Sequence, residues 1–233
     1  MKFYLSCLSV IVASFIAIPA QAQVSLGADF VSRYVWRGFD FGESFSIQPA
    51  ITFASSGFEV GAWGSYATAP GGAGANELDL WVGYSTDNFS FGLTDYYFPS
   101  PGGNAFFDFD EDDSDGGAHF FEPYASFTAG PVTVYGAAVI NNLAEDDSAI
   151  YLEASLPITT KTEGVELGLV SGFVLGESAF YGTNATTLVN LGVNASSDVS
   201  LGNVTLPVFV GYFLNATPGS ERTHLVFGFS LSN

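Results

Sequence analysis

The chain has 233 residues, of which 48% are hydrophobic and 12% are charged, and its formal net charge at pH 7 is -19. Only 5 Lys and Arg residues stand against 24 acidic residues, so we expect no nucleic-acid partner, because phosphates need basic side chains. Beyond the N-terminal segment, the sequence contains no run of the ~18–20 apolar residues that a membrane helix requires.

Residues 1–22 have the features of a cleaved signal peptide. A lysine follows Met1, an apolar run covers residues 8–18, and Ala20-Gln21-Ala22 forms a small-residue cleavage site. The only cysteine, Cys7, lies in this segment, so the mature chain, residues 23–233, cannot form a disulfide. Export combined with a high apolar content leaves two classes, an outer-membrane β-barrel or a soluble periplasmic β-protein.

From residue 24 onwards, segments of roughly ten residues alternate between apolar and small or polar side chains, as strands with two different faces do. The pattern predicts about twelve strands, at 24–38, 45–53, 58–66, 77–85, 89–98, 120–129, 132–141, 150–158, 165–174, 187–195, 204–213 and 223–231. An even number is typical of a bacterial barrel with both termini in the periplasm.

The connections alternate in length, which indicates the orientation of such a barrel. Short connections are predicted at 55–57, 87–88, 130–131, 159–163 and 197–200, and longer ones at 69–76, 99–118, 143–148, 175–185 and 215–221. We expect the short turns to face the periplasm and the long loops the exterior. The first connection, 40–43, belongs on the outer side although it is short.

The two faces of the strands favour a membrane barrel over a soluble sandwich. Aromatic residues fall near the expected outer rim (Tyr34, Trp36, Phe45, Tyr66 and Phe121) and near the inner rim (Phe53, Phe58, Tyr84, Phe89 and Phe127). The polar wall consists mostly of Gly, Ser, Thr, Ala and Asn with acidic residues, whereas a water-exposed wall would carry both charge signs. The sequence therefore predicts an all-β fold, an antiparallel transmembrane β-barrel of about twelve strands.

Several motifs resemble a known family. The segments SRYVWRG at 32–38 and GFEVGAWGS at 57–65, with further matches at 76–79, 94–99 and 122–124, resemble the TorF family of proteobacterial porins. This resemblance implies a channel in the outer membrane of a Gram-negative bacterium, with no catalytic residues. Barrels of this kind commonly end in an aromatic residue that the barrel-assembly machinery recognises, but this chain ends in Ser232-Asn233. Because the apolar alternation of Leu225, Phe227, Phe229 and Leu231 is present, we expect insertion to occur, but less efficiently.

Barrel closure makes the first and last strands neighbours, which predicts a group of charged residues in the lumen. Arg33 and Arg37 are expected beside Arg222 and His224, and the opposite wall is expected to carry Glu77, Asp79 and Glu122. One hypothesis is a pore constriction with a transverse field that filters polar solutes. The other is that these charges pair with one another and plug the lumen.

The longest loop is strongly acidic. Its carboxylates, which favour hard cations, are Asp108, Asp110, Glu111, Asp112, Asp113 and Asp115. The spacing does not match an EF-hand, since Asp113 stands where the turn needs glycine and His119 stands where the last glutamate belongs. A solvated loop is the favoured interpretation, with loose Mg²⁺ or Ca²⁺ binding that bridges to lipopolysaccharide phosphates as the alternative.

No residue pattern indicates an enzyme or a cofactor. A membrane lipase would need a Ser–His pair, and neither His119 nor His224 has a recognisable serine motif nearby. The favoured function is passive diffusion of small hydrophilic solutes with a bias toward cations. The alternative is a closed structural barrel whose acidic loops bind ions, lipopolysaccharide or another surface partner.

Overall fold

The computed structural model describes residues 23–69, 76–99, 106, 107, 109, 119–143, 147–158, 162, 164–219 and 222–233. The predicted signal peptide lies outside these residues. Twelve of the described strands form the barrel: β1 (Gln23–Val31), β4 (Ser46–Ser55), β5 (Phe58–Ala67), β6 (Glu77–Ser85), β7 (Phe89–Tyr97), β8 (His119–Ala129), β9 (Val132–Ala138), β10 (Ile150–Ile158), β11 (Val165–Val174), β14 (Thr187–Leu201), β15 (Val204–Leu214) and β16 (Thr223–Ser232).

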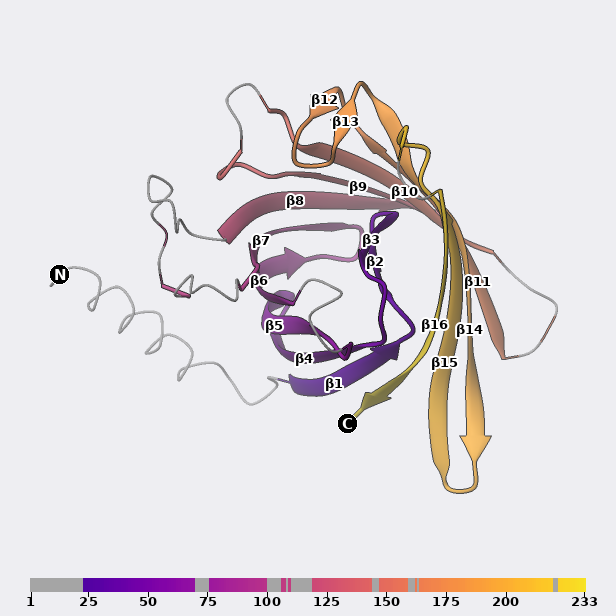
Figure 1. Cartoon of the computed structure of the whole chain (residues 1–233). Coiled ribbons are helices and arrows are strands. Elements are labelled where there is room, and N and C mark those ends of the chain that lie inside the picture. Colours follow the sequence, from indigo (N-terminus) through magenta and orange to yellow (C-terminus); the bar gives the residue numbers. More distant parts are fainter. Residues whose placement is uncertain are drawn as a thin grey trace, which may run out of the picture.

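These strands form a closed antiparallel ring in which each strand pairs with its neighbours along the chain (Figure 1). The ring closes between the first and last strands, where Gly27 to Val31 of β1 pair with Ser232 to Gly228 of β16. Closure gives every strand a partner on both sides, as a lipid environment requires of backbone N–H and C=O groups. The predicted fold class and strand number are confirmed.

The two faces of the ring differ as the sequence predicts. Outward side chains such as Leu26, Phe127 and Phe227 are 50%, 53% and 58% exposed, although they are large and apolar. Inward polar side chains such as Ser65 and Gln48 are buried. An apolar exterior around a polar interior is the arrangement of a transmembrane barrel and the reverse of a soluble one. Among the described residues, none forms a helix that is long and apolar enough to span a membrane.

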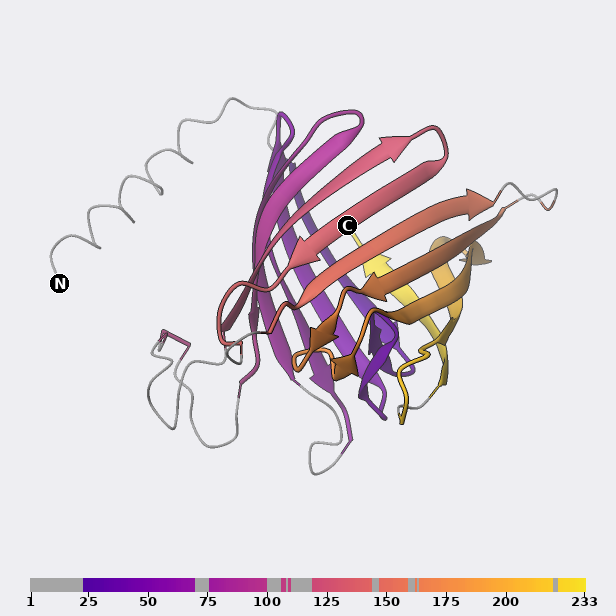
Figure 2. The same cartoon turned by 90° about the horizontal axis from the view of Figure 1, so that it is seen from above.

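The two ends of the barrel differ in their connections. We call the end that carries Gln23, Asn233 and the tight turns the inner rim, and the opposite end the outer rim. The hairpins β2–β3 (Tyr34–Trp36 and Phe39–Gly42) and β12–β13 (Glu177–Ser178 and Thr183–Asn184) both belong to outer-rim connections (Figure 2). The predicted turn at 197–200 is wrong, because β14 continues to Leu201 and the chain reverses at Gly202.

The first predicted strand, 24–38, is also wrong in its second half. β1 ends at Val31, and the hairpin β2–β3 then occupies the space inside the ring (Figure 1). Arg37 and Gly38 adopt φ angles of 51° and 80°, which is the two-residue turn that reverses a tight hairpin. The first outer connection is therefore a long inward loop and not the short one predicted at 40–43. Tyr34 and Trp36 belong to this loop and not to the outer aromatic belt.

Large inward side chains lie flat against glycines of the neighbouring strands. A Cβ atom added to Gly172 would lie 2.0 Å from the Tyr151 hydroxyl oxygen, and one added to Gly61 would lie 2.2 Å from the Trp81 ring. Because only glycine leaves room for this packing, these aromatic rings follow the wall. Substitution of either glycine would therefore displace the neighbouring ring.

Candidate functional site

The tip of the β2–β3 hairpin reaches the far wall of the barrel. Arg37 forms a bidentate ion pair with Glu122 of β8, in which its Nη1 and Nη2 donate to the two carboxylate oxygens over 2.6 and 2.8 Å. The hydroxyls of Tyr96 and Tyr135 also donate to Glu122, over 2.9 and 3.2 Å. The Glu122 side chain is completely buried, so its charge depends on these partners.

A second outer loop completes this cluster. Tyr181, between β12 and β13, accepts a hydrogen bond from Arg37 Nη1 over 2.6 Å. The same ring packs into a buried apolar cluster with Tyr151, Val174 and Val189 from the barrel wall. We call the hairpin β2–β3 together with the Tyr181 loop the plug; it occupies the outer half of the lumen.

Aromatic rings enclose the Arg37 guanidinium. Its Cζ atom lies 4.3 Å from the ring centre of Trp36 and 4.3 Å from that of Tyr151, which is the geometry of cation–π contacts. Burial alone would lower the pKa of Arg37, but the hydrogen bond with Glu122 and the neighbouring Tyr181 raise it well above its usual value. Arg37 is therefore a permanent cation inside the plug.

The base of the hairpin is also tied to the wall. Arg33 forms an ion pair with Asp40 over 2.7 Å, and His224 of β16 lies 3.8 Å from the same carboxylate. Asn215, in the connection between β15 and β16, donates its side-chain amide to the Gly38 carbonyl over 3.1 Å. The hairpin is thus held at its turn and at its base.

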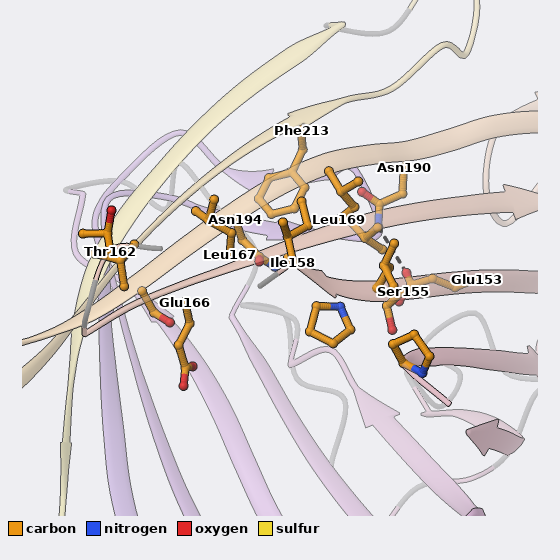
Figure 3. A pocket seen from close by; sticks show the side chains of 17 residues that line it. Glu153, Ser155, Ile158, Thr162, Glu166, Leu167, Leu169, Asn190, Asn194 and Phe213 are labelled. Atoms are coloured by element: carbon orange, nitrogen blue, oxygen red, sulfur yellow. Dashed lines mark hydrogen bonds between the residues drawn. The ribbon is translucent and has the colours of Figure 1, made fainter. Parts of the chain in front are cut away.

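Below the plug, the inner half of the lumen contains a cavity of about 830 Å³ against β10, β11, β14 and β15 (Figure 3). Glu153 and Glu166 are its charged lining residues, and Asn190 donates to Glu153 over 3.2 Å. A second cavity of about 420 Å³, beside β1 and β16, contains Asp29 and Arg33. Asn194, Ser196 and Phe213 line both cavities.

The charges of this inner region are mostly negative. The two cavities are lined by three carboxylates and by only one basic residue, Arg33. Arg33 is already paired with Asp40. Acidic side chains are therefore the main charged groups that face these two cavities.

A family model matches residues 19–174, which is more than half of the sequence, and its description is "Bacterial protein of unknown function (Gcw_chp)". The chain belongs to the Gcw_chp family. The match supports this family and not the TorF family in particular. No curated protein matches the sequence.

This Gcw_chp chain is similar to several solved outer-membrane barrels. The "KdgM porin" is 11% identical to this chain, with a TM-score of 0.46. The alignment covers 88% of this chain and 97% of the KdgM chain. The COG4313 outer membrane channel from Pseudomonas putida F1 is 14% identical, with a TM-score of 0.46 and coverage of 93% and 96%. A loop-deletion mutant of OmpT from Vibrio cholerae is 13% identical, with a TM-score of 0.37 and coverage of 91% and 76%. These low similarities say nothing about a solute.

The Gcw_chp structure separates the charged residues that were expected to form one constriction. Arg37 and Glu122 meet directly, so pairing describes them better than a field across an open gap. Arg33 instead pairs with Asp40, and Arg222 is exposed at the outer rim. Glu77 and Asp79 are buried on the inner face of β6.

The acidic loop residues lie outside the described part of the chain, and the described residues contain no cluster of three or more metal-binding side chains. His119 faces outward on β8, where its two ring nitrogens contact Asp95 and the Phe106 carbonyl, over 2.9 and 2.7 Å. His224 lies inside the barrel, as expected.

Sequence reasoning missed the second half of the Gcw_chp plug. Tyr181 stands in a connection between β12 and β13, where alternation gives no information about facing. A usable signal was present in the hairpin: Arg37-Gly38 is a two-residue turn flanked by the aromatic residues Trp36 and Phe39.

Proposed function

We propose that the chain is an outer-membrane channel for small hydrophilic solutes with a preference for cations. The observation that supports it most directly is the acidic pair of cavities that leads from the inner rim to the plug. The predicted signal peptide and the apolar outer wall favour the outer membrane as its location. The resemblance to TorF porins agrees with this function, and we assign no catalytic role to the chain.

The plug defines the control point of the proposed channel. It is built from two connections and not from barrel strands, so its displacement leaves the ring of hydrogen bonds intact. Solutes would pass between the plug and the wall, or after the plug has moved.

A second function, a closed structural barrel, is favoured by one observation. The Arg37–Glu122 pair and the apolar cluster around Tyr181 hold the plug by a buried network, and such networks are costly to break. In this case the lumen conducts nothing, and any activity belongs to the outer surface.

Planar-bilayer recording distinguishes the two functions. The chain from residue 23 is folded in detergent and compared with a variant in which residues 34–42 are replaced by a short Gly-Ser linker. A channel gives discrete conductance steps, and the steps are larger in the linker variant. In a KCl gradient, the sign of its reversal potential shows that K⁺ is more permeant than Cl⁻. A folded wild type that is silent while the linker variant conducts indicates a closed barrel, and silence of both refutes the channel.

A further inference from the structure

A third cavity lies between the plug and the outer ends of β6, β7 and β8. Its volume is about 320 Å³, within the lower range of small-molecule sites. Nine of the ten lining residues are aromatic, and the tenth is Glu77. Phe98, Phe120 and Phe180 contribute from connections and strand ends at the outer rim, so this outer cavity lies on the side of the molecule opposite to the two termini.

Glu77 is an unusual residue in such a lining. Glu77 is only 2% exposed. Its carboxyl group contacts the Tyr34 hydroxyl and the neighbouring carboxyl group of Asp79. Its second oxygen, Oε2, has no hydrogen-bond partner among the described residues, and the same is true of Asp79 Oδ1. A buried carboxylate without full compensation costs free energy.

No protein cation compensates these two carboxyl groups in the described part of the chain. The ion pairs found there use Asp40, Glu122 and Asp95, and none includes Glu77 or Asp79. Glu77 and Asp79 stand two residues apart on the inner face of β6, so this buried acidic pair has no basic partner among the described residues.

The plug itself shows which group would satisfy such a site. Arg37 is a cation held between the faces of Trp36 and Tyr151 and paired with the buried carboxylate of Glu122. The outer cavity repeats this combination of aromatic faces and one buried carboxylate, with Trp36 taking part in both, but none of its ten lining residues is basic. We propose that the outer cavity binds an organic monocation, an ammonium group carried on an aromatic or alkyl body.

Other ligand classes fit these residues less well. An anion would face Glu77 and Asp79. Ca²⁺ and Mg²⁺ need six or more oxygen ligands, which nine aromatic residues and one carboxylate do not supply. A neutral apolar molecule fills the volume but leaves Glu77 Oε2 without a partner.

Binding at this site does not depend on conduction through the lumen. The test therefore measures binding to the folded barrel in detergent micelles and does not use conductance. If the proposed channel failed in bilayers, binding here would be unaffected, and the reverse also holds.

The probe is benzyltrimethylammonium, which has an aromatic ring and a permanent positive charge. Binding is measured by isothermal titration calorimetry and by the fluorescence of Trp36 in a variant in which Trp63 and Trp81 are replaced by phenylalanine. We expect saturable 1:1 binding that changes Trp36 fluorescence. Glu77→Gln keeps the shape of the side chain and should weaken binding at least about tenfold, because it removes a charge-assisted contact.

Glu43→Gln is the matched control, since Glu43 is an exposed carboxylate between β3 and β4 that does not line the cavity, and it should leave the affinity unchanged. Benzyl alcohol, a neutral analogue, should bind at least about tenfold more weakly than the cation. Phe98→Leu, which removes a ring from the rim of the cavity, supplies a second variant in case Glu77→Gln does not fold, and it should also weaken binding. Absence of binding to the wild type, equal affinity of Glu77→Gln, or equal affinity for benzyl alcohol would overturn the proposal.

Discussion

Arg37 and Glu122 are 85 residues apart in the sequence, and they form a bidentate ion pair inside the barrel. Nη1 and Nη2 of Arg37 lie 2.6 and 2.8 Å from the two carboxylate oxygens. One partner stands on the turn of an inward hairpin and the other on a wall strand. This contact fixes the hairpin in the lumen, and it is the first target for mutation.

Replacing Arg37 by methionine should destabilise the folded barrel by about 3–5 kcal/mol, because Glu122 then remains buried without its cation. Urea unfolding in lipid vesicles, followed by tryptophan fluorescence, measures the change. The double variant Arg37→Met with Glu122→Gln should recover part of the loss, since it removes both charges. A single variant as stable as the wild type would contradict the buried pair.

Gly38→Ala should dislodge the turn of the hairpin. The residue has a φ of 80°, which costs a non-glycine residue about 1–3 kcal/mol in backbone strain. In addition, a Cβ atom there would lie 1.9 Å from the Val189 carbonyl oxygen and clash with it. Gly130→Ala is the control, because its φ of 58° is also positive but nothing lies within 4 Å. The unfolding free energy should fall more for Gly38→Ala; equal losses would mean that the turn does not touch β14.

Gly172→Ala should force the Tyr151 ring away from the barrel wall. The added methyl group would lie 2.0 Å from the tyrosine hydroxyl oxygen, which itself donates to Glu153. We expect a loss of about 1–3 kcal/mol in unfolding free energy, as is usual for overpacking. Gly136→Ala serves for comparison, since its new Cβ would meet only the end of the flexible Leu152 side chain, at 3.1 Å. Similar stability of both variants would show that Tyr151 moves aside freely.

The inner carboxylates should set the ion preference of the proposed channel. Replacing Glu153 and Glu166 together by glutamine removes two of the three carboxylates that line the inner cavities, so the ratio of K⁺ to Cl⁻ permeability should fall, roughly twofold or more at low salt. Reversal potentials in a KCl gradient measure this ratio. Glu43→Gln, on the exposed part of the first connection, should leave it unchanged. An identical ratio in the double variant would exclude these residues from the ion path.

The barrel itself was predictable because each of its strands lies between two different environments. Successive side chains of a strand face lipid and lumen in turn, so hydrophobic residues recur at every second position. The predicted segments 77–85, 150–158 and 165–174 have the same bounds as β6, β10 and β11. The period cannot show where a strand leaves the wall. Residues 34–36 continue the alternation of β1 because the inward hairpin also has two distinct faces.

The site was predictable only in part, for a related reason. Arg37 and Glu122 were both expected in the lumen, since polar residues of a barrel strand face inward. Their direct contact depends on how far a connection reaches across the ring, and alternation contains no information about that distance. Tyr181 was missed altogether, because it stands in a connection with no period to interpret.

The position of the plug has a consequence for the order of assembly. Arg37 follows the strand at one end of the unrolled sheet, whereas Glu122 lies on a strand near its middle, so the two residues come together only when the sheet curls. A flat sheet leaves the hairpin with no opposite wall to bind. The ion pair therefore forms only after the strands from β1 to β8 have paired and their sheet has curved.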